Sequence, residues 1–206
     1  MPASQVQHRE GLQALLTFGY LRDQTRRWQL RESESDTQTG PKVWAGKHLV
    51  LDEVLHIIAE RALVVTGANG IAIALPEGDA IICRASVGTI VPDSSASIDP
   101  NSGFSGVCLR AGRMVRCNDA ENDSRVNVLA CRRLGARSMV AVPLVAHPNV
   151  IGLIEAFSGD PGAFSIPDAF RLSLLGEMIV AVINPQERER MAAISHRVMV
   201  GEADRV

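Results

Sequence analysis

Apolar residues recur at helical spacing in two long segments, one on each side of a region of shorter apolar runs. The first segment ends near Gly67 and carries apolar positions at Leu51, Val54, Leu55, Ile58, Ala62 and Val65. This spacing predicts one buried stripe on a helix. The second segment reaches about Ile183, and it begins with Ser165 as a candidate N-cap and Pro167 in the first turn.

Five shorter apolar runs predict strands. Residues 70–75 and 80–88 are separated by Pro-Glu-Gly-Asp, whose Pro and Gly suit a tight turn, so these runs predict a hairpin. Residues 137–146 and 150–158 flank His-Pro-Asn and predict a second hairpin. The run Met-Val-Arg-Cys, residues 114–117, is the fifth strand candidate.

A loop and a short helix are expected after the first hairpin. Residues 92–102 are rich in Ser, Asp and Pro, which is typical of a loop. Ser102 or Ser105 is then placed to cap a helix through about Ala111, because a hydroxyl can accept a hydrogen bond from a free amide of the first turn.

A second short helix is expected before the second hairpin. Asp123 is its candidate cap, and the helix would run through Leu134 and end at Gly135, since glycine tolerates the left-handed conformation there. We call residues 102–135 the lid, because this insertion is expected to cover one face of the sheet.

The order of helix, hairpin, insertion, hairpin and helix predicts an α+β fold with an antiparallel sheet. One sheet face takes the first and last helices, and the lid covers the other. We place this domain at residues 42–184. Residues 1–41 are expected to form an N-terminal helix over 5–32 and a flexible polar linker, and residues 185–206 a charged helical extension that serves as an output linker.

Composition and charge exclude several classes of protein. The chain has 206 residues, of which 46% are hydrophobic and 21% charged, and this balance is typical of a soluble globular protein. The formal net charge of −2 gives no reason to expect nucleic acid or an anionic membrane as a partner. No run approaches the ~18 apolar residues of a membrane span, and the N-terminus lacks the apolar core of a signal peptide, so we expect a cytoplasmic protein.

The sequence offers four cysteines and little else for catalysis. Their spacing contains no C-x-x-C pair, which excludes the usual zinc signature, and a reducing compartment favours free thiols. The histidines do not combine with a Ser or Cys into a nucleophile–base pair, so no catalytic residue and no metal site are expected. The cysteines are Cys83, Cys108, Cys117 and Cys131.

Three motifs resemble those of the GAF domains over about Leu49–Val182. They are GFSGVCLRAGRMVRCND (Gly103–Asp119), CRRLGARSMVAVPL (Cys131–Leu144) and VIGLIEAFS (Val150–Ser158). The resemblance implies a central antiparallel sheet of about six strands with a small-molecule pocket between the sheet and the lid. It also implies that the terminal helices pair with a second copy and pass a signal to an output domain.

Polar residues of the lid and the second hairpin are the candidates for this pocket, because a ligand site usually combines apolar walls with a few convergent polar groups. Asp119, Asp123 and Arg125 have the alternative of a capped helix and a local Asp–Arg pair. Glu155 either anchors a ligand from inside the sheet or points outward into solvent. The candidate ligand-binding residues are Cys108, Cys117, Asn118, Asp119, Asp123, Arg125, Arg137, Ser138 and Glu155.

We therefore expect a non-catalytic sensory or regulatory module that binds an unidentified small molecule and forms a homodimer. Its cofactor is unknown, and its output lies in a separate protein such as a kinase or a transcription regulator. One alternative is a free methionine-R-sulfoxide reductase, the enzymatic branch that the resemblance includes, with Cys108, Cys117 and Cys131 as the thiols. In that branch one cysteine directly precedes a Gly and another directly precedes an Asp. No cysteine of this chain precedes either residue. Another alternative is a structural dimerisation module without a ligand.

Overall fold

The computed structural model describes residues 42–184, with side chains from Leu51 onward. The chain divides into two units, Met1–Val50 and Leu51–Val206, and the fold below is that of the second unit. The helix expected over 5–32, the linker over 33–41 and the extension over 185–206 lie outside the described residues. The domain boundaries at 42 and 184 therefore stay predictions.

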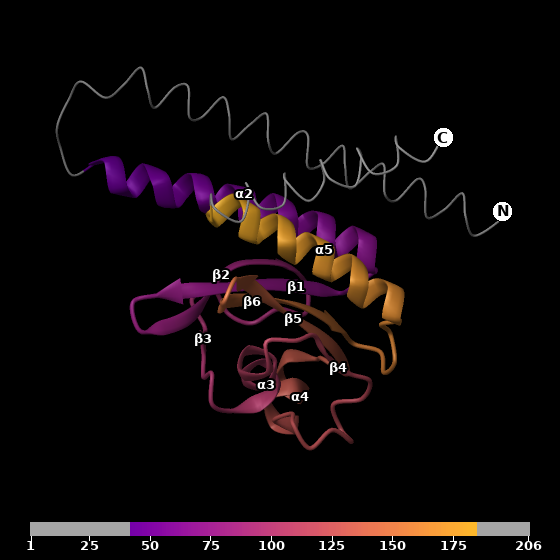
Figure 1. Ribbon diagram of the computed structural model, residues 1–206. Helices are drawn as coiled ribbons and strands as arrows, with labels where there is room; N and C mark the ends of the chain where they lie inside the picture. The colour runs from indigo at the N-terminus through magenta and orange to yellow at the C-terminus, as the bar shows by residue number, and fades with distance from the viewer. Residues whose placement is uncertain (1–41, 185–206) are drawn as a thin grey trace, which may run out of the picture. The chain divides into compact units, whose positions relative to one another are not determined.

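Ten helices and strands make up the described part of the chain (Figure 1). The six strands form one sheet in the order β3-β2-β1-β6-β5-β4, and every neighbouring pair is antiparallel. This confirms the predicted α+β class. The elements are α2 (Lys42–Thr66), β1 (Gly70–Glu77), β2 (Ala80–Gly88), β3 (Ser97–Ile98), α3 (Gly103–Ala111), β4 (Val115–Cys117), α4 (Val128–Leu134), β5 (Ser138–Ala146), β6 (Asn149–Ser158) and α5 (Ile166–Ile183).

Both predicted hairpins are present, and their inner strands pair with each other at the centre of the sheet. Strand β1 pairs with β2 on one side and with β6 on the other. The β1–β6 register sets Gly70 opposite Phe157 and Ala72 opposite Glu155. The outermost strands are short: β3 has two residues and β4 has three. The sequence pattern missed β3, which lies in the segment predicted as a loop.

Helices α2 and α5 cover one face of the sheet, which we call the helix face (Figure 1). Helix α5 approaches closely at Gly176, where an added Cβ would lie 3.3 Å from Leu144 and 3.6 Å from Ile154. Burial of each such Leu or Ile side chain contributes about 1.5–3 kcal/mol. The largest fully buried aliphatic side chains of the two helices and the strands include Leu55, Ile58, Ile71, Ile73, Leu144, Ile154, Leu172 and Ile179.

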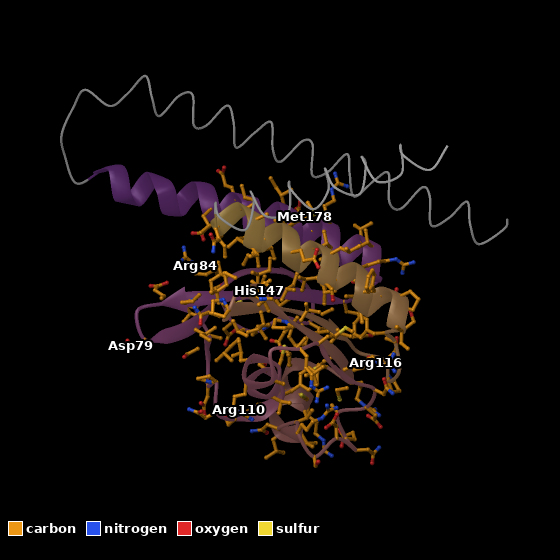
Figure 2. All side chains as sticks on the ribbon, viewed as in Figure 1. Asp79, Arg84, Arg110, Arg116, His147 and Met178 are labelled. Carbon is orange, nitrogen blue, oxygen red and sulfur yellow. The ribbon has the colours of Figure 1, made fainter. Side chains whose placement is uncertain are left out.

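A charged contact fixes α2 to the sheet on the same face. Arg84 of β2 reaches toward α2, where its guanidinium donates to the Asp52 carboxylate at 2.8 Å (Figure 2). Arg84 also lies 3.6 Å from the Glu77 carboxylate at the end of β1. The predicted first helix is thus held by its apolar stripe and by an ion pair. Val65, which the pattern assigned to that stripe, is 41% exposed.

The lid packs on the opposite face of the sheet, as predicted (Figure 1). Helix α3 contacts β5 and β6, and a continuous set of buried side chains fills the space beneath the lid. These residues are Ala72, Ala74, Cys83, Phe104, Cys108, Leu109, Val115, Cys117, Ala120, Cys131, Ala136, Met139, Ala141, Leu153 and Phe157. We call them the lid cluster.

The route of the chain explains why α3 lies over the middle of the sheet. Helix α3 follows β3 at one edge of the sheet and precedes β4 at the other edge. Five inter-strand spacings separate these edges, which is about 24 Å. The connection between β3 and β4 must cross this width, and α3 is its central part. The crossing brings α3 over the central strands, including β6.

One of the three predicted helix starts is misplaced, and a second is right in position but lacks the expected capping hydrogen bond. Asn127, and not Asp123, caps α4: its side chain accepts a hydrogen bond from the Ala130 amide at 3.1 Å. Asp123 lies four residues too early for this role and binds Arg125 instead. Ser102 occupies the N-cap position of α3, but its side chain makes no capping hydrogen bond.

The other predicted helix boundaries are confirmed. Ser165 caps α5 in a capping box, in which its hydroxyl accepts from the Asp168 amide while the Asp168 carboxylate accepts from the Ser165 amide. Gly135 ends α4 with a φ of 83°, a left-handed conformation that few other residues adopt without strain. The membrane prediction was tested on the described helices, and none of them is long and apolar enough to cross a bilayer.

Replacing Asn127 tests the observed cap. We expect Asn127→Ala to lower the free energy of unfolding by about 1 kcal/mol, because the side-chain acceptor for the first-turn amide is lost. Asn127→Ser retains an acceptor and should restore most of this loss. Urea denaturation of the three proteins gives the comparison, and equal losses for Ala and Ser would show that capping is not what Asn127 contributes.

Candidate functional site

Glu155 lies on the lid face in the middle of the sheet. Side chains alternate along β6, and Leu153 and Phe157, two residues to either side, belong to the lid cluster. Its cross-strand neighbours are Ala72 on β1 and Ala141 on β5. Both neighbours are small, so the carboxyl is flanked by methyl groups and is itself only 5% exposed. Glu155 thus points inward beneath the lid and not outward into solvent.

A single side chain from the lid holds this carboxyl. The Ser105 hydroxyl on α3 donates to Glu155 Oε1 at 2.7 Å, and within residues 51–184 no other donor reaches the carboxyl. Burial raises the pKa of Glu155 from 4.5 to about 7, and the Ser105 hydrogen bond opposes part of this rise. The site therefore contains an acid that titrates near neutral pH and has no basic partner among the described residues.

Three thiols from three different elements lie near enough to Glu155 for its charge to affect them. Cys108 lies one helical turn after Ser105 on α3, so the two side chains share a face of the helix. Cys83 comes from β2 and Cys131 from α4. The charge of Glu155 raises the pKa of each of these thiols, in every case after burial, which is the larger cause. Glu155 is thus set among groups that stay uncharged at neutral pH.

The thiols show no sign of activation. Burial raises the pKa of Cys108 to about 12, with the Glu155 charge as the second cause. Burial likewise raises the pKa of Cys117 to about 12, helped by a hydrogen bond to Asp123. A nucleophilic or redox-active cysteine needs the opposite shift. All four cysteines are free and buried: Cys83, Cys108, Cys117 and Cys131.

Asp119 and Arg137 join the lid to the start of β5. The Arg137 guanidinium donates to Asp119 Oδ1 through Nη2 at 2.9 Å and through Nε at 3.2 Å. Asn122 donates to the other oxygen of Asp119 at 2.7 Å. These bonds, led by that from Arg137, lower the pKa of Asp119. Both charged residues are satisfied within the protein, so the pair fastens the lid loop.

Asp123 and Arg125 form a second pair that joins three parts of the lid. The Arg125 side chain donates to Asp123 through Nε at 2.8 Å and to the Arg116 carbonyl at 2.9 Å. Its guanidinium carbon lies 5.6 Å from the centre of the Phe104 ring, which is within the range of a cation–π contact. Hydrogen bonding to Arg125 lowers the pKa of Asp123 to about 2. The local Asp–Arg alternative therefore describes these residues.

The remaining two candidates lie away from Glu155. Asn118 is exposed, and its carbonyl accepts a hydrogen bond from the Gly162 amide at 2.7 Å. Ser138 is buried, and its hydroxyl donates to the Asp160 carbonyl at 2.7 Å. Ser138 is adjacent to Met139, whose side chain belongs to the lid cluster. Because adjacent side chains of a strand point to opposite faces, Ser138 lies on the helix face of β5. Neither residue converges with Glu155.

Sequence reasoning missed Ser105 as a site residue because it considered that serine only as a helix cap. The three-residue spacing of Ser105 and Cys108 was a usable signal for two side chains on one helix face. The alanines beside Glu155 could not be paired with it from the sequence, since strand register was unknown. A separate hollow of about 370 Å³, lined by Leu129, Arg132 and Arg133, lies at α4 and not at Glu155.

The Glu155 carboxyl makes this site a hydrogen-bond acceptor. A carboxyl with one oxygen bonded to Ser105 can accept further hydrogen bonds or bind a cationic group. Within residues 51–184 no group of three or more His, Cys, Asp or Glu side chains is arranged to hold a metal ion. The lid cluster occupies the same region, so a ligand bound there would contact its side chains.

Comparison with protein families gives one match over most of the described chain. A family model described as GAF domain matches residues 48–184. A comparison with curated protein sequences finds no match.

Solved structures with the same fold include two kinds of protein. The type II free methionine-R-sulfoxide reductase from Thermoplasma acidophilum has a TM-score of 0.59 at 17% identity, covering 67% of this chain and 95% of its own. The free methionine-R-sulfoxide reductase from Neisseria meningitidis, solved with its substrate, has a TM-score of 0.56 at 22% identity, covering 64% of this chain and 76% of its own. The GAF domain of an Acinetobacter phosphoenolpyruvate-protein phosphotransferase has a TM-score of 0.57 at 18% identity, covering 92% and 98%.

Proposed function

Because the chain belongs to the GAF domain family, we propose that it is a non-catalytic sensory or regulatory module that binds a small ligand between the lid and the sheet. The observation that carries this proposal is the buried carboxyl of Glu155, held by Ser105 alone from the lid. A buried carboxyl is costly to the fold, and such costs are commonly found where a protein binds something. The position on a central strand beneath a separate layer supports a ligand site.

The ligand class follows from the charge of the site. An ionised Glu155 lacks a basic partner in residues 51–184, so a protonated amine or another cationic donor would supply the missing counter-charge. Alanines on both sides of Glu155 restrict the lateral contacts to methyl groups, which leaves the polar recognition to Glu155 and Ser105. We therefore propose a small ligand with a cationic donor group and an apolar body.

Binding of this kind would be communicated through the lid. Ser105 belongs to α3, so a ligand donor that competes for Glu155 would release the hydroxyl that ties α3 to the sheet. The Asp119–Arg137 and Asp123–Arg125 pairs would still hold the loop that follows β4. We propose that the resulting movement of α3 is the signal.

The wider setting of the module is also part of the proposal. We place it in the cytoplasm as a homodimer joined through its terminal helices, with the output in a separate protein such as a kinase or transcription regulator. The Acinetobacter structure supports a regulatory setting, because it is the GAF domain of a larger protein, a phosphoenolpyruvate-protein phosphotransferase.

A ligand screen by thermal shift tests the proposal. We expect at least one compound from a panel of amino acids, methylated amines and polyamines at pH 8 to raise the melting temperature saturably. Glu155→Gln should remove this shift, because the amide keeps the size of the side chain and loses its charge. Glu53→Gln is the matched control, since Glu53 is an exposed carboxylate on α2 and its removal should leave the shift intact.

Native mass spectrometry of the purified protein complements the screen, because it detects a retained ligand as an added mass that is lost on denaturation. No saturable shift from any compound together with no added mass would support the ligand-free scaffold instead. A shift that survives in Glu155→Gln would place the ligand elsewhere on the domain.

A further inference from the structure

Charge is distributed unevenly between the lid and the rest of the domain. Between residues 102 and 135 the sequence has six arginines and three acidic residues. The remainder of residues 51–184 has four arginines and eleven acidic residues. The lid is therefore a basic layer on an acidic domain, and it attracts anions locally although the formal net charge of the chain is −2. The lid arginines are Arg110, Arg113, Arg116, Arg125, Arg132 and Arg133.

The acidic residues of the lid are all paired with arginines. Asp119 and Asp123 form the two pairs that hold the lid loop. The third acid, Glu121, accepts two hydrogen bonds from Arg132, through Nε at 2.9 Å and through Nη2 at 2.6 Å. This bonding lowers the pKa of Glu121, so the carboxylate stays charged and holds the Arg132 guanidinium in one orientation. The excess positive charge of the lid belongs to arginines without an acidic partner.

Two of these arginines make no bond within residues 51–184. Arg110 and Arg116 each donate to a backbone carbonyl. The side chains of Arg113 and Arg133, in contrast, are exposed and make no hydrogen bond or ion pair within residues 51–184. Each therefore presents all of its guanidinium N–H donors to acceptors outside the domain.

Arg133 also lines the hollow of about 370 Å³ at α4, together with Leu129 and Arg132. Helix α4 belongs to the layer opposite α2 and α5 (Figure 1). The three side chains share one side of α4, because the arginines follow Leu129 by three and four residues. Leu129 is 67% exposed, so its apolar surface is open to solvent. Small-molecule sites have volumes of roughly 300–1,000 Å³ and combine apolar walls with a few polar groups, as this hollow does.

The two guanidiniums of the hollow differ in their charge balance. The Glu121 carboxylate balances the charge of Arg132. The charge of Arg133 is not balanced by any acid within residues 51–184. A guanidinium binds a carboxylate or a phosphate through two parallel hydrogen bonds, because its planar fork matches two oxygens. An anion on Arg133 would lie about one helical turn from Leu129, so an apolar group attached to the anion can cover that side chain.

We propose that this hollow binds a small organic anion, with its carboxylate or phosphate group on Arg133 and its apolar part against Leu129. The site goes beyond the proposed function, because Glu155 is buried beneath the lid and would take a cationic group. The observations favour a small anion over a nucleic acid or a membrane, since the eleven acidic residues outside the lid would repel an extended polyanion.

Titration with octyl phosphate, followed by amide NMR of the full-length chain, tests the site. We expect saturable shifts in the amides of residues 127–135 at concentrations below those at which octyl phosphate forms micelles. Inorganic phosphate should bind there about tenfold more weakly or less, because it lacks the apolar part and burial of two methylene groups accounts for about that factor. Octanoate should shift the same amides, since a carboxylate also offers two oxygens to a guanidinium.

Matched substitutions separate the hollow from the charge of the lid as a whole. Arg133→Gln should raise the octyl phosphate dissociation constant about tenfold or more, because charge-assisted hydrogen bonds are lost. Arg113→Gln is the control: it removes the same charge from an exposed arginine outside the hollow, so the constant should change less than about twofold. Leu129→Ser should remove the advantage of octyl phosphate over inorganic phosphate. All three replaced side chains are exposed, so we expect each variant to fold.

The contrary results are distinct from one another. Equal affinities for octyl phosphate and inorganic phosphate would indicate an adventitious ion only, and the absence of saturable shifts would overturn the site outright. Equal losses in Arg133→Gln and Arg113→Gln would overturn it too, because they would indicate non-specific attraction to the basic lid.

A vesicle assay distinguishes a soluble anion from a membrane lipid. Co-sedimentation of the chain with phosphatidylglycerol vesicles, abolished by Arg133→Gln, would overturn the small anion in favour of a lipid headgroup. We expect no co-sedimentation, because most of the domain is acidic. None of these results bears on the amine screen, whose thermal shift depends on Glu155.

Discussion

Glu155→Gln should make the protein more stable than wild type at pH 8 and nearly equal to it at low pH. The ionised carboxyl is buried without a basic partner among the described residues, so keeping it charged destabilises the native state, whereas the amide is neutral at every pH. The Ser105 hydroxyl can still donate to the amide oxygen. The expected gain is large because one buried charge is removed and nothing of similar size is lost.

The direction of this change in stability follows from the pKa of Glu155. The usual value for glutamate is 4.5, and burial raises it to about 7 in the native protein. Between these values the native state holds a proton that the unfolded chain has released. The stability that comes from this proton is fully present below about pH 4.5 and is lost as the pH rises through about 7. The complete loss corresponds to about 3 kcal/mol.

Urea denaturation of both proteins at pH 5 and at pH 8 measures this effect. Relative to Glu155→Gln, the wild type should lose about 2–3 kcal/mol of unfolding free energy between the two pH values. Ser105→Ala offers an independent check, because loss of its hydrogen bond should raise the pKa of Glu155 further and leave the sign of the effect unchanged. If the unfolding free energies of wild type and Glu155→Gln changed by the same amount between the two pH values, Glu155 would not be a buried, ionisable acid.

All four thiols of the native protein should resist alkylation. Cys108 and Cys117 have pKa values of about 12 against a usual 9, which lowers their thiolate fraction near pH 8 by about a thousandfold. Burial raises the pKa of Cys83 and Cys131 as well, and it also keeps reagents away from all four sulfurs. The expected result is a native protein that gains no adduct on a time scale at which an exposed thiol reacts fully.

Intact-mass analysis after iodoacetamide treatment at pH 8 gives the measurement, and the same treatment in guanidinium should add four adducts. Rapid native modification of Cys108, Cys117 or Cys131 would favour the methionine-R-sulfoxide reductase alternative, since that chemistry begins with a thiolate and ends in a disulfide. Turnover of free methionine-R-sulfoxide by the wild type, abolished in Cys108→Ser and Cys117→Ser with the fold intact, would establish it. The shared fold with two such reductases does not supply an active thiol by itself.

The long elements could be predicted from the sequence because each has a clear hydrophobic periodicity or clear turn and capping residues at its ends. The two hairpins have apolar runs separated by Gly or Pro turns, and the capping box of Ser165 and Asp168 marks the start of α5. Strand β3 could not be found, because two residues carry no period. The start of α4 was misplaced, since Asp123 and Asn127 are both good caps, and in the structure Asp123 binds the neighbouring Arg125 while Asn127 caps the helix.

The candidate site was predictable in its location and only partly in its members. Glu155 was visible in the sequence as the one acid of an apolar strand, but the face on which it lies could not be read from that strand, whose partner residues on β1 are 79 to 87 positions away. The charged candidates of the lid were correctly seen as a possible Asp–Arg pair, and the structure uses Asp119, Asp123, Arg125 and Arg137 to hold the lid together. Ser105 became part of the site only when α3 was placed over β6.

The two- and three-residue strands at the borders of the sheet have a consequence for how this protein meets others. A long open border offers unpaired amides and carbonyls to any extended chain, and this is a common route to aggregation and to strand addition. Here β3 and β4 leave room for very few such backbone bonds before the chain turns away into the lid. Strand addition to β3 or β4 is therefore limited to a few backbone bonds.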